Sequence, residues 1–330
     1  MPISNLHIMQ VSFLPELIAL AKNQGVHVDK ILFKTSLSKF NLSNPDSYVP
    51  LNSLYDFLLS LEHKMGCPLI NGDYRNVFSV KNLGSYGSNF LQQPDLLKGF
   101  EQVEAFQNTH KSNLKIDFTL EGSTAKLTWY FIDQPSSGRT LMERITFAQL
   151  MDAFKLACSA NWEPLEVNFT SESIKHLASL LPSGNYKINC KQAINSVTFS
   201  SSLLLTSLNF TEDGKISKLN KPTEQSDDLP SKIQLLIQNC KHGRILGLDD
   251  CSDIFNLSER QIRRNLAIHN TSFLEIHSRV QFLKSIHFLE NENASILEIS
   301  QILGYSNSSN FIKAFKKWAQ TTPALYRNNL

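Results

Sequence analysis

The chain has 330 residues, of which 42% are hydrophobic and 19% are charged, and its formal net charge at pH 7 is +2. This composition excludes a disordered or fibrous chain, and the length predicts about two globular domains. No apolar run approaches the roughly 18 residues of a membrane span. Met1–Leu17 lacks the basic segment and cleavage site of a signal peptide, so we expect a cytoplasmic protein without membrane contact.

The N-terminal region changes from a helical to an alternating apolar period along the chain. The predicted helices of its first hundred residues are 9–24, ended by Gly25, 50–66, and one that starts at Pro94. Two strands, 113–121 and 124–133, are predicted to form a hairpin around Gly122. The elements predicted after it are a helix at 140–159, a strand at 165–169, a helix at 171–180, and strands at 187–190 and 194–199. The region is therefore predicted to be α+β.

A polar stretch at 218–230, with two prolines and no apolar periodicity, predicts a linker. It separates a predicted N-terminal domain at 1–217 from a C-terminal domain at 231–330. The C-terminal domain holds 12 Lys and Arg against 8 Asp and Glu, whereas residues 1–230 hold 20 against 22. Contact with phosphates requires local positive charge, so the C-terminal domain is the predicted nucleic-acid surface. Because the surplus of positive charge is only four, the alternative interpretation is that these basic residues form a solvated helix face without a nucleic-acid partner.

The C-terminal domain contains one pattern, a helix, a turn and a second helix, twice. In the second copy, a helix with apolar Ile296, Ile299 and Ile302 precedes a turn at Gly304 and a helix that starts at Ser306. The inward positions of the latter are Phe311, Phe315 and Trp318. Its outward positions are Ser309, Lys313, Lys316 and Lys317. One face is therefore apolar and the other basic.

The first copy contains a helix that Ser258 is expected to cap. Its inward positions are Ile262 and Leu266, and its outward positions are Arg260, Arg263 and Arg264. A helix over about 272–289 joins the two copies and spans roughly 27 Å at 1.5 Å per residue. The apolar stripe predicted for this joining helix consists of Phe273, Leu274, Ile276, Val280, Leu283 and Ile286.

Residues 231–330 resemble the DNA-binding domain of the AraC/XylS family of bacterial transcription regulators. The residues that carry the resemblance are Ile299, Leu303, Gly304, Tyr305, Ser306, Phe311, Ala314, Phe315, Lys317, Trp318, Pro323, Tyr326 and Arg327. The departures from the family's signature are Ser300 in place of Ala, Lys313 and Lys317 in place of Arg, and Gln320 in place of Gly. The resemblance implies an all-α domain with two helix-turn-helix motifs joined by a long linker helix, and double-stranded promoter DNA as its partner.

The resemblance also implies which residues contact DNA. The implied base-reading residues are Arg260, Gln261, Arg263 and Arg264 in the first copy, and Ser308, Ser309, Asn310 and Lys313 in the second. Lys316 and Lys317 are expected to contact phosphates. Arginine forms two hydrogen bonds with guanine, so we expect the first copy to supply more of the base discrimination. One of the three arginines, with Arg264 as the candidate, is expected to form an ion pair within the protein instead.

Residues 20–208, through segments 82–102 and 162–169, resemble the ligand-binding domain of regulators of the ornithine-utilisation type. This resemblance implies a small-molecule effector of unknown identity and a homodimer, and RNA polymerase is a further expected partner. In the alternative interpretation, the domain serves only dimerisation or protein interaction. A sensor needs an enclosed apolar pocket of a few hundred Å³, which a dimerisation module does not. The side chains of the kind that line such pockets are Tyr86, Trp129, Tyr130 and Arg144.

The sequence contains none of the common catalytic or metal-binding motifs. The GxGxxG, P-loop, GxSxG and HExxH patterns are missing, and the nine histidines lack metal-ligand spacing. The five cysteines form no CxxC pair, which argues against a zinc site, a disulfide framework and a DNA-repair methyl acceptor with clustered cysteines. We therefore expect no catalytic residue, cofactor or metal. The chain is interpreted as a sequence-specific DNA-binding transcription regulator that responds to an effector, and not as an enzyme.

Overall fold

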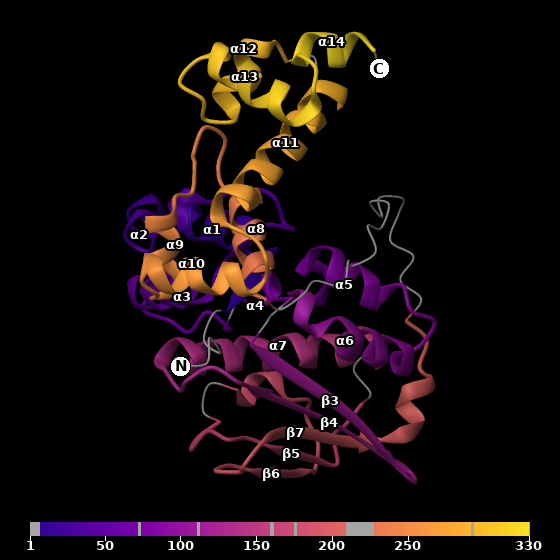
Figure 1. Ribbon diagram of the computed structural model, residues 1–330. Coiled ribbons are helices and arrows are strands. Elements are labelled where there is room, and N and C mark those ends of the chain that lie inside the picture. Colours follow the sequence, from indigo (N-terminus) through magenta and orange to yellow (C-terminus); the bar gives the residue numbers. More distant parts are fainter. Residues whose placement is uncertain are drawn as a thin grey trace. The chain divides into compact units, whose positions relative to one another are not determined.

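The computed structural model of the protein describes residues 7–71, 74–110, 113–158, 162–174, 177–208, 228–291 and 294–329. The chain forms two compact units, and Figure 1 labels their α-helices and the strands β3 to β7. The first unit comprises Met1–Leu37, Leu42–Ser47 and Leu51–Gln225. The second comprises Ser38–Asn41, Tyr48–Pro50 and Ser226–Leu330, and each unit is considered by itself below.

A five-stranded sheet in the order β3-β4-β7-β5-β6 is the framework of the first unit. Its strands are β3 (Leu114–Glu121), β4 (Thr124–Phe131), β5 (Glu166–Asn168), β6 (Lys187–Asn189) and β7 (Asn195–Ser200). The β3 and β4 strands pair antiparallel in full register, and Gly122 turns between them with φ +60°. The predicted hairpin is therefore confirmed. Strand β7 pairs antiparallel with β4 and β5, whereas β5 and β6 are parallel.

Helices cover one face of this sheet (Figure 1). The longest, α7 (Ser137–Cys158), is buried along most of its length, because both of its long sides carry apolar residues. Its Phe154 ring meets Phe199 of β7 with a centroid distance of 4.8 Å and Phe100 of α6 (Leu96–His110) with 5.4 Å. The other named elements before residue 209 are β1 (Ile8–Gln10), α1 (Leu14–Asn23), α2 (Val28–Lys34), β2 (Tyr48–Pro50), α3 (Leu51–Met65), α4 (Tyr74–Val77), α5 (Gly84–Leu91) and the 3₁₀ turns η1 (Leu37–Lys39), η2 (Val80–Asn82), η3 (Ala178–Leu180) and η4 (Ser201–Leu205).

The predicted helices of the first unit differ from the observed elements: α6 starts two residues after Pro94, and α7 starts three residues before the predicted 140. The helix predicted at 9–24 starts only at Leu14, because a strand precedes it and a proline occupies its first turn. The helix predicted from Pro50 starts one residue later, as α3. The helix predicted at 171–180 is wrong for the described residues, which contain only η3. There, the Ser171 carbonyl accepts a hydrogen bond from the Lys191 amide at 3.0 Å, which replaces a helical partner.

From residue 228 onward the second unit is helical, and together with the sheet-containing first unit this confirms the predicted fold class. Its helices are α8 (Leu229–Gln238), α9 (Leu248–Phe255), α10 (Glu259–Ile268), α11 (Phe273–Asn291), α12 (Ile296–Ile302), α13 (Ser308–Ala319) and α14 (Pro323–Asn328). Of the stretch predicted as a linker, 218–227 lies outside the described residues. The Asp228 side chain caps α8 by accepting the Ser231 amide at 2.8 Å, so Leu229 and Pro230 belong to the helix.

Candidate nucleic-acid interface and ligand cavity

Helices α9 and α10 form the first helix-turn-helix motif. Ser258 caps α10 as predicted: its hydroxyl accepts the backbone amide of Gln261, and the side-chain Oε1 of Gln261 accepts the backbone amide of Ser258 at 2.8 Å. Ile262 and Leu266 are fully buried, which confirms the predicted inward face. The cap fixes the Gln261 side chain at the start of α10, so this predicted base reader has only its amide NH₂ free of the cap.

The three arginines of α10 lie exposed on its outer face. Arg263 forms an ion pair with Glu259, with an Nη2–Oε2 distance of 3.1 Å. The expectation that Arg264 would form the ion pair was therefore wrong: Glu259 lies one helical turn before Arg263, and side chains at i and i+4 are neighbours. For Arg260 and Arg264, no ion pair is found within the described part of the chain.

Helices α12 and α13 form the second motif. Ser295 caps α12 in a reciprocal arrangement with Glu298, and Gly304 makes the turn with φ +80°. The helix predicted from Ser306 begins two residues later, because the extended Asn307 caps it and accepts the Asn310 amide at 2.9 Å. Phe311 and Phe315 are fully buried and Trp318 packs against the same core, as predicted.

The outer face of α13 is polar and basic. The exposed side chains among its predicted DNA contacts are Ser309, Asn310, Lys313, Lys316 and Lys317, while Ser308 is half-buried. Asn310 donates its Nδ2–H to the Ser306 hydroxyl at 2.9 Å, which orients the amide at the start of the helix. None of the three lysines has an ion pair with a described residue. Their charges therefore face solvent.

Helix α11 has 19 residues and spans about 28 Å between the two motifs. Ile276 and Val280 are buried as predicted, but Leu274 and Leu283 are 73% and 47% exposed, so the predicted stripe is wrong at these positions. Buried Gln281 and Ser285 occupy the inner face instead, and each donates a side-chain hydrogen bond to a backbone carbonyl. A polar side chain is tolerated inside because its hydrogen bond is made there.

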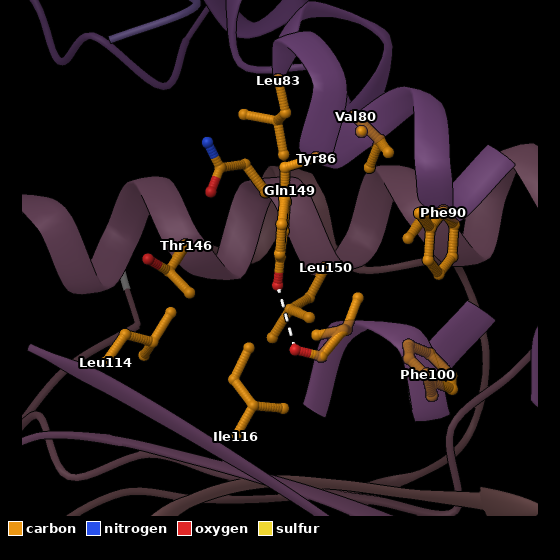
Figure 2. Close-up of a pocket in the computed structure, with 13 residues that line it drawn as sticks. Val80, Leu83, Tyr86, Phe90, Phe100, Leu114, Ile116, Thr146, Gln149 and Leu150 are labelled. Carbon is orange, nitrogen blue, oxygen red and sulfur yellow. Dashed lines mark hydrogen bonds between the residues drawn. The ribbon is translucent and has the colours of Figure 1, made fainter. Parts of the chain in front are cut away.

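The first unit contains a cavity of about 50 Å³ at the junction of η2, α5, α6, α7 and β3 (Figure 2). Its lining residues are Val80, Leu83, Tyr86, Gly87, Phe90, Phe100, Val103, Leu114, Ile116, Thr146, Gln149, Leu150 and Ala153. The Tyr86 hydroxyl donates a 3.3 Å hydrogen bond to the Val103 carbonyl, and burial raises its pKa. Sequence reasoning missed Thr146 and Gln149, since nothing local distinguishes them from other polar residues of a helix.

Of the four side chains suggested from the sequence for a pocket, the structure brings only Tyr86 to this cavity. Trp129 is buried in the core and stacks on Phe147 with a centroid distance of 5.9 Å. Tyr130 is 37% exposed, and Arg144 lies 3.4 Å from Glu62 in an ion pair. Among the described residues, no group of three or more His, Cys, Asp and Glu side chains is placed to hold a metal ion. No helix in the described ranges has the length and apolarity to cross a membrane.

Two family models match the chain. Residues 251–329 match a helix-turn-helix domain, and residues 25–207 match the arabinose-binding domain of AraC transcription regulator, N-terminal. Similar curated proteins include the ornithine utilization regulator of Pseudomonas aeruginosa, 30% identical over 80 residues that cover 24% of each chain. The transcriptional activator CfaD of Escherichia coli is 36% identical over 72 residues, which cover 22% of this chain and 27% of CfaD. These matches span about a quarter of the relatives' length.

Among solved structures, the transcriptional regulator CdpR of Pseudomonas aeruginosa is 15% identical, with a TM-score of 0.34, over 82% of this chain and 91% of CdpR. The two curated relatives are named as a regulator and a transcriptional activator. The N-terminal family match covers more than half of the 330 residues, and the helix-turn-helix match follows it along the chain. The chain therefore belongs to the AraC family of transcription regulators.

Proposed function

We propose that the protein regulates transcription by binding double-stranded promoter DNA through both helix-turn-helix motifs, under the control of a small-molecule effector bound by residues 1–217. The observation that carries this proposal is the exposed positive charge on the outer faces of α10 and α13, where Arg260, Arg264 and the three lysines of α13 form no ion pair with a described residue. Second helices of such motifs enter the major groove, and positive charge there attracts phosphates. We propose that the regulator acts in the cytoplasm, where promoter DNA is.

The residues that we propose to contact DNA divide between base edges and phosphates. The proposed base readers are Arg260, Gln261, Arg263 and Arg264 of α10, and Ser308, Ser309, Asn310 and Lys313 of α13. Lys316 and Lys317, near the end of α13, are proposed to contact phosphates. An Arg guanidinium bound to guanine discriminates by about 1–3 kcal/mol, whereas a lysine offers a point charge. The first motif is therefore proposed to discriminate between bases more strongly than the second.

The linker helix supports reading of two successive major-groove segments by one chain. Its length of about 28 Å, together with the widths of the motifs at its ends, matches the ~34 Å between groove centres one helical turn apart. We propose that a homodimer, in contact with RNA polymerase at promoters, is the working form. A DNA-binding regulator whose N-terminal domain serves only dimerisation remains the second candidate, because the apolar cavity beside Tyr86 has a volume of only about 50 Å³.

The proposed function is tested by separate Arg263→Ala and Lys313→Ala substitutions in the full chain. Binding is measured at one salt concentration, both to a duplex selected from a random pool and to a scrambled duplex. Arg263→Ala should weaken binding to the selected duplex by about 1–3 kcal/mol more than binding to the scrambled one. Lys313→Ala should weaken both by more similar amounts.

The matched control is Arg279→Ala, because Arg279 is an exposed arginine on α11, outside both second helices. It removes one positive charge and is expected to leave the difference between the two duplexes unchanged. The reverse order of the Arg263 and Lys313 effects would overturn the assignment of roles. Failure of the unsubstituted chain to bind any duplex would overturn the function itself.

A further inference from the structure

We propose that the cavity of the first unit is the effector site, and that it takes a small, uncharged and largely apolar molecule with one hydrogen-bonding group, rather than a sugar. The proposal rests on the proposed effector-responsive function and specifies the chemistry of its ligand. All thirteen lining residues belong to the first unit, so the site is complete within it.

The surface that the lining residues present to a ligand is almost entirely hydrocarbon. Ten of the thirteen are apolar side chains or glycine, and none of these described residues carries a charge. The polar groups are the Tyr86 hydroxyl and the side chains of Thr146 and Gln149, both buried on α7. Figure 2 shows Thr146 and Gln149 at one side of the cavity and the rings of Phe90 and Phe100 at the other. The arrangement fits a ligand with a polar group at one end and a hydrocarbon skeleton at the other.

A pentose does not fit this chemistry, although the matching family model is described as arabinose-binding. A pentose carries four hydroxyl groups, and each buried hydroxyl without a partner is strongly disfavoured. The Tyr86 hydroxyl already donates to the Val103 carbonyl, which leaves few groups to serve four hydroxyls. Each buried hydroxyl of a bound sugar needs a hydrogen-bond partner, because buried polar groups in proteins are hydrogen-bonded. An apolar skeleton meets this cavity without such losses.

The size of the cavity limits the ligand. Its volume of about 50 Å³ is well below the ~300 Å³ at which ordinary ligand pockets begin. A molecule of several carbon atoms therefore has to separate α5 from α6. The contact that opposes this movement is the 3.3 Å hydrogen bond from Tyr86 on α5 to Val103 on α6. On its other side α5 packs closely on η2, since a Cβ at Gly87 would lie 1.9 Å from the Val80 carbonyl oxygen.

The test measures the thermal unfolding of the full chain with 1-butanol, 1-pentanol, 1-hexanol and L-arabinose. The three alcohols should raise Tm, and each added methylene should tighten binding about fourfold. At a hundredfold excess over Kd, the shift should be roughly 5–10 °C. Arabinose should leave Tm unchanged. A shift with arabinose and none with the alcohols would overturn the proposal.

Two variants locate the binding site. Ala153→Leu fills the cavity and should abolish the alcohol shift, while Ala148→Leu, a buried position of the same helix outside the lining, should preserve it. Tyr86→Phe removes the hydrogen bond that resists opening and should tighten alcohol binding about two- to tenfold. If Ala153→Leu does not fold, the effect of Tyr86→Phe on alcohol binding tests the site instead. Alcohol shifts that are equal in all folded variants would overturn the site. DNA binding by the same samples reports the proposed function separately, so either can fail alone.

Discussion

We expect Gln320→Gly to stabilise the second helix-turn-helix motif. Gln320 ends α13 with φ +57° and ψ +12°, in the left-handed region. That conformation is disfavoured by about 1–2 kcal/mol for a residue with a Cβ but not for glycine. The substitution also removes an exposed hydrogen bond from the Gln320 side chain to the Lys317 carbonyl. It makes the unfolded chain more flexible as well, and the two effects together cancel about 0.5–1 kcal/mol of the stabilisation. The expected net gain is about 0.5–1 kcal/mol.

Amide hydrogen exchange of α13 in the folded full chain measures this gain locally. A gain of about 0.5–1 kcal/mol corresponds to exchange that is roughly two- to fivefold slower. The matched control is Gln301→Gly, because Gln301 is an exposed glutamine within α12 and has no left-handed conformation to relieve. There, glycine should accelerate exchange, since it weakens a helix interior. If both substitutions accelerate exchange, the argument from the left-handed conformation is refuted.

Three further predictions concern the core, a turn and the buried thiols of the second unit. Phe311→Ala should lower the free energy of unfolding by about 3–5 kcal/mol in urea, because its ring is fully buried in the core of the second motif. Gly304→Ala should lower it by more than about 1 kcal/mol, since φ is +80° and the new Cβ would lie 2.8 Å from the Ile245 side chain. Burial raises the pKa of Cys240 to about 11 and of Cys251 to about 12 from 9.0. Between these pH values the two thiols keep their protons in the folded state but lose them in the unfolded chain. The free energy of unfolding is therefore unaffected by these thiols below about pH 9 and falls as the pH rises to about 12. The urea midpoint should fall more steeply over this range than in Cys251→Ala, and parallel curves would contradict the prediction.

Local signals predicted the motifs well. The hairpin follows from alternating strands around a glycine, and the start of α10 follows from Ser258 with Gln261 three residues later. The ion pair on α10 was also readable, because Glu259 and Arg263 are spaced i, i+4, yet Arg264 was expected to form it. Sequence reasoning therefore found the exposed basic faces but not how the charges on them pair.

Properties that depend on contacts between distant segments were not predictable. The inner face of α11 was assigned from apolar residues alone, which placed Leu283 inside and overlooked Gln281. Gln281 is buried because the Leu303 carbonyl, 22 residues away in the chain, accepts its side-chain hydrogen bond. The cavity is a stronger case, since its walls come from segments between Val80 and Ala153 and no local pattern relates them. The helical period of the apolar residues shows which face of a helix points inward. The segment that packs against this face determines which polar side chains can be buried on it.

A short middle section of α11 makes hydrogen bonds toward both motifs. Lys284 donates its Nζ–H to the Ile237 carbonyl near the end of α8 at 3.0 Å, and α8 packs against α10. Gln281 donates to the Leu303 carbonyl at the end of α12 at 3.3 Å. The two donors are three residues apart, a rise of only about 4.5 Å along the helix. A lysine near a helix C-terminus is favoured by the partial negative charge of its carbonyls, although burial lowers the pKa of Lys284. One turn of α11 therefore makes hydrogen bonds toward both motifs, and Phe288 and Leu289 extend its contact with the second motif, because they lie in the same core as Phe311.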